Sequence, residues 1–328
     1  MEERASGPPD AHTPKPPHAN GLHLSTAPRM LILHTRFSEN APVLMSRLRF
    51  PLLAILLAGN LLWVGCTSEP DSVDNTVVAP TDTIEPTTRA DSVAYRLLQA
   101  HGADALASAP YLRFDFGIEM PAGRQTIARH LWNRKTGDYR IEWSEGGDSS
   151  YVALVNVRKI REGRVAGTVY LNGEELTGPA DTTARTTAYA RFVNDTYWLL
   201  SPLKAFDPGV NRTYLPDSST AEHAVIRLTF DDVGRTPGDQ YWLYVSKETG
   251  RLDRWVYHLQ GMAEEEPPQH YAWTQYQELK APNGTVHLAA RKESASANRA
   301  LLTNNLALPS SPPDGAFSNP EPMLRAGE

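Results

Sequence analysis

The residues of this sequence that could do chemistry are one cysteine, two adjacent aspartates and ten histidines. Asp231 and Asp232 are neighbours, and neighbouring side chains on a strand point to opposite faces, so the two carboxylates would not share a proton. The histidines from His101 to His287 form no H-x-H, H-E-x-x-H or i,i+4 pair, so the sequence predicts no metal or cofactor. Without a G-x-S-x-G nucleophile motif, we expect no enzyme.

The single cysteine, Cys66, directly follows the apolar run LLAILLAGNLLWVG. This run is too short for a transmembrane helix, which needs about 20 apolar residues. Met45, Arg47 and Arg49 supply a basic region before it, and Gly65 is a small residue at its end. These features are typical of an export signal, so we predict a signal peptide at residues 45–65.

The sequence WVGC resembles the bacterial lipobox, although Trp63 stands where an aliphatic residue is usual. The resemblance implies that Cys66 is lipidated and becomes the mature N-terminus, which would anchor the protein to a membrane, since several acyl chains together bind stably. Thr67 in place of Asp favours the outer membrane. The expected location is therefore a periplasm-facing position in the cell envelope.

Composition divides the chain into five segments. Residues 1–44 are Pro-rich and lack periodicity, so they are interpreted either as an over-extended gene start before Met45 or as a disordered cytoplasmic head. Residues 66–90 are rich in Thr, Ser, Asp and Pro and predict a flexible tether, and residues 293–328 predict a disordered tail. The folded domain is expected at residues 91–292. Its acidity, within a net charge of −6, argues against nucleic acid as a partner.

Alternating hydrophobicity dominates this domain. In YLRFDFGIEM, beginning at Tyr111, the apolar side chains share one face, and HLWNRKTGDYRIEW predicts a hairpin. About ten strands follow this pattern, with helices expected only at 91–102 and 181–195. The predicted fold class is α+β: a large curved antiparallel sheet, a half-barrel of about ten to eleven strands, with helices covering its concave face.

A resemblance sharpens this fold prediction. The segment NDTYWLLSPLKAFDPGVNRTYL, which we expect to be an extended crossing broken by Pro202, is followed by YWLYVSKETGRLDRWVY, and AHG closes the first helix. Together these stretches resemble the LolA/LolB-like lipoprotein-sorting proteins of the outer membrane, and most closely uncharacterised lipoproteins of Bacteroidetes-type bacteria. The resemblance implies a half-barrel around an apolar cavity, with an affinity for apolar ligands.

The leading functional hypothesis is a monomeric, membrane-anchored lipoprotein that binds a lipid or the acyl chain of a lipoprotein. Two modest helices cannot cover the whole concave face, which would leave an apolar cavity for such a ligand. The alternative is a non-catalytic envelope scaffold or interaction protein whose barrel is filled by its own side chains. Strand parity predicts the following cavity residues: Phe114, Phe116, Ile118, Trp143, Trp198 and Leu228.

Overall fold

The computed structural model describes residues 81–161, 164–231, 236–294 and 296–324. The chain divides into two units, Met1–Gly65 and Cys66–Glu328, and every element below belongs to the second. The predicted segments 1–44 and 45–65 and the predicted lipidation site Cys66 lie outside the described residues.

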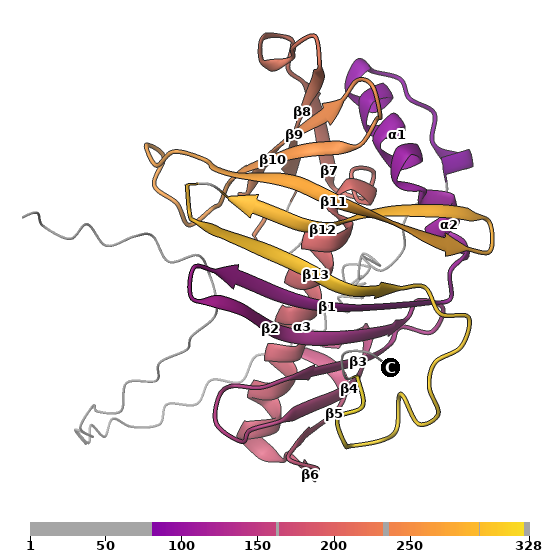
Figure 1. Cartoon of the computed structure of the whole chain (residues 1–328), viewed down its shortest axis with the longest axis vertical. Coiled ribbons are helices and arrows are strands. Elements are labelled where there is room, and N and C mark those ends of the chain that lie inside the picture. The colour runs from indigo at the N-terminus through magenta and orange to yellow at the C-terminus, as the bar shows by residue number, and fades with distance from the viewer. Residues whose placement is uncertain (1–80, 162–163, 232–235, 295, 325–328) are drawn as a thin grey trace, which may run out of the picture. The chain divides into compact units, whose positions relative to one another are not determined.

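The described residues form one antiparallel sheet of 13 strands (Figure 1). Its spatial order is β6-β5-β4-β3-β2-β1-β13-β12-β11-β10-β9-β8-β7, so nearly every strand pairs with its sequence neighbour. The bounds are β1 (Tyr111–Met120), β2 (Gly123–Asn133), β3 (Asp138–Trp143), β4 (Tyr151–Arg161), β5 (Arg164–Leu171), β6 (Glu174–Glu175), β7 (Val210–Tyr214), β8 (His223–Phe230), β9 (Gln240–Ser246), β10 (Leu252–His258), β11 (Gln269–Ala281), β12 (Gly284–Ser294) and β13 (Arg299–Ala307).

The prediction of an α+β fold with a large antiparallel sheet is confirmed, but its finer detail is not. The sheet is open, with β6 and β7 at its edges, and it is not curled or closed into the predicted half-barrel. It also has 13 strands in place of ten to eleven. Much of the difference comes from β13, which lies inside the segment predicted to be a disordered tail and pairs with both β1 and β12.

The chain enters the sheet through two short helices. In α1 (Arg89–His101), the Thr88 side chain accepts a hydrogen bond from the Asp91 backbone N–H, and the Asp91 carboxylate accepts one from the Thr88 N–H, which makes a complete capping box. Gly102 ends α1 at a φ of 75° and leads directly into α2 (Ala103–Ser108). The helix predicted at 91–102 is therefore present with nearly the expected bounds.

The third helix, α3 (Gly178–Leu200), is longer than its sequence suggests. The sequence pattern predicted a helix only at 181–195 and an extended crossing after it. Instead α3 continues through Trp198, and Pro202 lies in the short 3₁₀ helix η2 (Ser201–Leu203) that ends it. Burial of Trp198 and Leu199 outweighs the poor helix propensity of the threonines, because packing of an apolar face supplies most helix stability in proteins.

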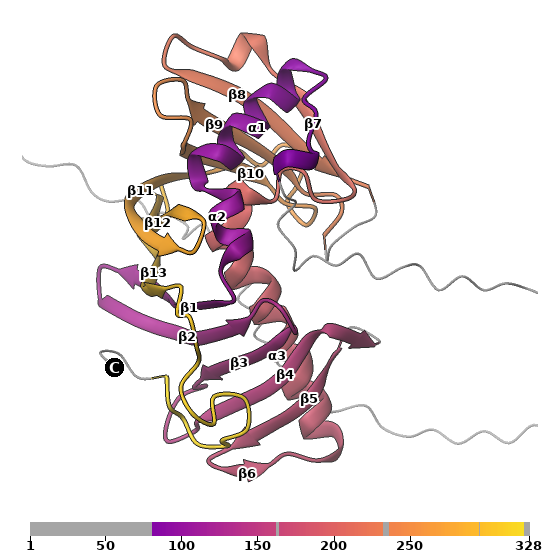
Figure 2. The ribbon, with the colours of Figure 1, turned by 90° about the vertical axis from the view of Figure 1, so that its right-hand side faces the viewer.

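The two faces of strands β1 to β5 are covered by different elements. Helix α3 crosses one face (Figures 1 and 2). There Phe192 packs edge-to-face on Tyr139 of β3. The adjacent residue Arg140 points to the other face, where it bonds to backbone oxygens of the segment after β13. We call this segment, residues 309–324, the C-terminal strap; its buried residues include Ala316 and Leu324.

The strap is a second correction to the predicted disordered tail at 293–328. Its prolines and serines made it look unstructured, but its partners are groups distant in the sequence, which local composition does not reveal. Among the helices of the described residues, none is both long and apolar enough to cross a membrane.

Candidate functional site

The predicted cavity residues all lie on the face of the sheet that α3 covers. Residues directly opposite each other on paired strands project their side chains to the same side. Ile118 is opposite Leu301, which is opposite Lys292, which is opposite Trp273. Leu228 is likewise opposite Tyr241, and Trp143 opposite Ala128. Trp198 comes from α3 itself and contacts Trp255 of β10, with ring centroids 4.4 Å apart. We call this side of the sheet the α3 face.

The α3 face is packed with the protein's own side chains. The six predicted residues are between 0% and 7% exposed. Phe114 stacks on His130 at 4.3 Å, and Trp143 stacks on Tyr151 at 4.8 Å. Trp198 also contacts Tyr271 and Tyr257. Such close aromatic packing leaves little room for a ligand beside these residues, and their role as a cavity lining stays a prediction.

A buried polar cluster fastens α3 to the sheet. Asp195 of α3 places Oδ2 3.1 Å from Nε2 of His130 on β2, and the Tyr139 hydroxyl lies 2.9 Å from the other ring nitrogen, Nδ1. All three residues are at most 2% exposed. Burial lowers the pKa of His130, although Asp195 opposes the shift. The ring is therefore held neutral, and Nδ1 accepts from the Tyr139 hydroxyl, which assigns the proton to Nε2; Nε2 faces Asp195 Oδ2 without forming a hydrogen bond of good geometry.

This cluster combines an acid, a histidine and a tyrosine, but it contains no nucleophile aligned with the histidine and it is closed to solvent. A structural role in fixing α3 follows from these contacts. Among the residues that the structure describes, no group of three or more His, Cys, Asp or Glu side chains could hold a metal ion.

A lysine is also buried on the α3 face. The Lys292 Nζ donates hydrogen bonds to the Ala289 carbonyl at 2.6 Å and to the Thr303 hydroxyl at 2.9 Å, and it lies 5.0 Å from the ring centre of Trp273. The residue is fully buried, and burial lowers its pKa well below the ordinary 10.5. No carboxylate of the described residues forms an ion pair with it.

The opposite face of β1 to β4 carries a different arrangement. Arg140 and Glu142 alternate along β3 with the residues that face α3, and Arg140 Nε donates to Glu142 Oε1 at 2.6 Å. Both side chains are almost fully buried beneath the C-terminal strap, and both bond to its backbone. Sequence reasoning missed this pair, because alternation places Tyr139, Ile141 and Trp143 on one face of the strand but does not show that a distant segment covers the other.

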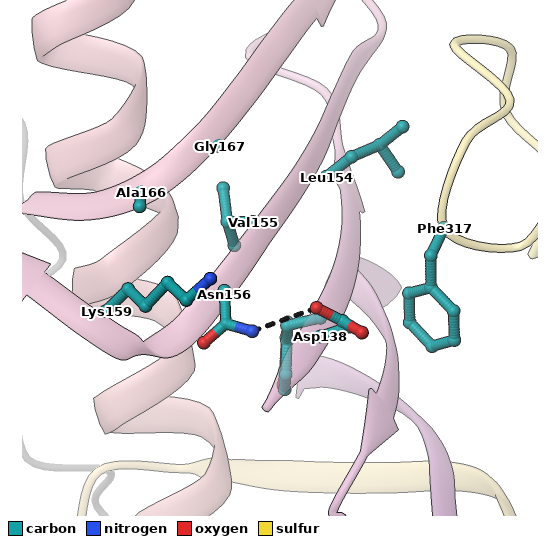
Figure 3. Close-up of a pocket in the computed structure, with 9 residues that line it drawn as sticks. Asp138, Leu154, Val155, Asn156, Lys159, Ala166, Gly167 and Phe317 are labelled. Carbon is teal, nitrogen blue, oxygen red and sulfur yellow. Dashed lines mark hydrogen bonds between the residues drawn. The ribbon is translucent and has the colours of Figure 1, made fainter. Parts of the chain in front are cut away.

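Beside the strap lies a hollow of about 360 Å³ (Figure 3). Phe317 of the strap lies on one side of it, while Asp138, Asn156 and Lys159 contribute from β3 and β4. The Asn156 amide donates to Asp138 at 2.9 Å. A smaller hollow of about 100 Å³ includes Trp143, the only predicted cavity residue that lines either of the two. Both hollows therefore involve the strap side of the molecule, since Pro322 lines the second.

No protein-family model and no curated protein sequence matches this chain. Its structure is similar to that of a DUF1329 family protein from Desulfovibrio piger, with 10% identity, 71% of this chain and 98% of that chain covered and a TM-score of 0.39. It is also similar to a domain described as an outer membrane lipoprotein-sorting protein from Vibrio parahaemolyticus, with 9% identity, coverage of 68% and 97% and a TM-score of 0.36. A third match is MucB, with 15% identity, coverage of 73% and 62% and a TM-score of 0.20.

The predicted resemblance to lipoprotein-sorting proteins is thus confirmed as a structural match at low identity. With TM-scores below 0.5, these similarities assign neither a function nor a site to this chain.

Proposed function

We propose that this protein is an exported cell-envelope lipoprotein that binds a partner polypeptide and catalyses no reaction. The observation that carries the proposal is the packing of the α3 face. The apolar side chains that would hold an acyl chain are already covered by α3 and by neighbouring aromatic residues, and Phe114 is fully buried. Of the two hypotheses raised by the sequence, this packing favours an interaction protein in which the protein's own side chains occupy the space above the α3 face.

Attachment to the membrane belongs to the same proposal. The basic, apolar and small residues before Cys66 support an export signal, and the resemblance to a lipobox supports lipidation, with Thr67 favouring the outer membrane. The residues after the cysteine would then hold the sheet on the periplasmic side. Growth of the producing cells with a clickable fatty-acid analogue tests this part: wild type should carry label, and Cys66→Ala should not. Label on both proteins would contradict the lipidation of Cys66.

A second candidate function keeps the acyl-chain hypothesis, and the buried Lys292 favours it. An amine without a carboxylate partner, close to Trp273 and opposite Leu301, would suit the carboxylate of a fatty acid whose chain lay along the α3 face. Binding of this kind would require α3 to move away from the sheet.

Native mass spectrometry of the soluble chain, purified without detergent, separates the two candidates. The protein used for this test carries the single substitution Cys66→Ala, so that no lipid attached covalently at Cys66 adds to the measured mass. The interaction protein should give the mass of the bare chain. A stoichiometric non-covalent adduct of lipid mass would favour the second candidate and overturn the first.

A further inference from the structure

The C-terminal strap is held almost entirely through its backbone. Arg140 donates from Nη1 to the Ala316 carbonyl at 3.2 Å and to the Asn319 carbonyl at 2.7 Å, and from Nη2 to the Glu321 carbonyl. One guanidinium therefore accounts for three strap carbonyls. Since every residue has a carbonyl, these bonds place no demand on the side chains of the segment they hold.

Glu142 binds the N–H groups of the strap backbone, as Arg140 binds its carbonyls. Its carboxylate accepts hydrogen bonds from the backbone N–H groups of Met323, at 2.8 Å, and Leu324, at 3.2 and 3.1 Å. Arg113 of β1 donates to the Leu324 carbonyl at 3.2 Å. The Arg140–Glu142 pair thus presents donors and acceptors in a fixed order along the strap, and this order sets the direction in which a chain can lie.

Apolar side-chain contacts add to these bonds, among them Phe317 of the strap stacked on Tyr111 of β1 with ring centroids 6.5 Å apart. Leu131 of β2 packs with Ala316 and Leu324 of the strap in a buried cluster, with Phe317 and Met323 partly buried at its border. Much of the rest of the strap is exposed, including Asp314. The strap is therefore a peripheral layer, attached at two points by apolar side chains and between them by main-chain bonds.

Main-chain hydrogen bonds with pockets for a few side chains are a common way in which proteins bind peptide segments. We propose that the face of β1 to β3 beneath the strap is a groove for a segment of a partner polypeptide that turns as the strap does at Gly315–Asn319, and that the strap occupies this groove as an intramolecular competitor. The fitting segment has a small residue and a larger aliphatic residue at the positions of Ala316 and Leu324. This inference rests on the proposed function and names the surface and the kind of partner for it.

A tethered occupant competes at a high effective concentration, so a free peptide should bind wild type weakly. The probe is a fluorescent synthetic peptide with the sequence of residues 308–324, added to the full chain and followed by fluorescence anisotropy. Leu324→Ala in the chain weakens the strap without altering the groove, and it should tighten peptide binding at least tenfold. Asp314→Ala, at an exposed strap position, is the matched control and should bind like wild type.

A second variant tests the groove itself. Adding Glu142→Gln to Leu324→Ala removes the carboxylate that accepts from the two strap N–H groups, and it should reduce peptide affinity at least tenfold. Circular dichroism melts establish that each variant is folded. Equal peptide binding by folded Leu324→Ala and wild type would overturn the proposal, as would undiminished binding by the double variant.

Hydrogen exchange on the wild-type chain provides a test that depends on no variant. The Met323 and Leu324 amides should exchange faster than the amides of β2 and β3, because the strap opens while the sheet remains folded. Exchange of these amides only with global unfolding would refute a displaceable strap. If either test fails while the native mass spectrum shows the chain without a lipid adduct, the groove proposal is refuted and the proposed function is retained. A lipid adduct in that spectrum would instead refute the proposed function.

Discussion

The buried Lys292 gives a prediction whose size can be worked out. In the unfolded chain its amine titrates near 10.5, whereas in the folded protein burial lowers the pKa well below that value. Between the folded pKa and 10.5, the unfolded state binds more protons than the folded state, so stability rises with pH. The slope for one proton is at most about 1.4 kcal/mol per pH unit.

The substitution Lys292→Met removes this slope. Methionine has a similar length and no charge. The Thr303 hydroxyl still donates to the Ala289 carbonyl at 2.9 Å in the variant, so this buried carbonyl keeps a hydrogen-bond donor. Each unit by which burial lowers this pKa corresponds to about 1.4 kcal/mol, so we expect Lys292→Met to be more stable than wild type at pH 7.

The assay is guanidinium chloride unfolding at several pH values from 7 to 10. Lys280→Met is the matched control, because Lys280 is exposed on the neighbouring strand β11 and donates to the Thr285 hydroxyl. Other titrating groups contribute equally to all three proteins, so the difference between their slopes isolates Lys292. Parallel stability curves for wild type and Lys292→Met would refute the reasoning.

Three further predictions concern packing. Trp198→Ala should cost about 3–5 kcal/mol of unfolding free energy in chemical denaturation, because the indole fills the centre of an aromatic cluster; a loss below 1 kcal/mol would mean that this region is not close-packed. Tyr139→Phe should cost about 1–3 kcal/mol, since it leaves the buried Nδ1 of His130 without a donor; an unchanged melting curve would contradict the cluster. Gly102→Ala should cost about 2 kcal/mol or more, because φ is +75° and a Cβ there would lie 2.1 Å from the Thr285 carbonyl oxygen; calorimetry showing an unaltered melting temperature would disprove it.

The sequence correctly predicted which side chains of the strand β1 share a face of the sheet. Alternation in β1 correctly placed Phe114, Phe116 and Ile118 on one face, because a half-buried strand must repeat every two residues. The first helix was predicted equally well, because Gly102 and the Asp91 carboxylate in its first turn are local signals, although the N-cap is Thr88. These features depend on residues close together in the chain.

The missed features depend on contacts between distant residues. Strand β13 lies between a stretch of Ser, Ala and Asn before it and a Pro-rich stretch after it, and it departs from regular pairing near Arg113, where the register shifts. The strap is held by Arg140 and Glu142, which lie more than 170 positions earlier in the chain. The outcome for the α3 face has the same origin: alternation shows which residues face inward, but only the course of α3 shows that Trp198 fills the space beside them.

The central claim is that the α3 face is occupied by the protein's own side chains. Fatty acids brominated along the acyl chain quench tryptophan fluorescence on contact, and Trp198, Trp255 and Trp273 all lie on this face. The most direct measurement is a titration of the purified chain with brominated fatty acid against its unbrominated counterpart. The account predicts the same tryptophan fluorescence in both titrations. Saturable quenching by the brominated chain alone, at one equivalent, would contradict it.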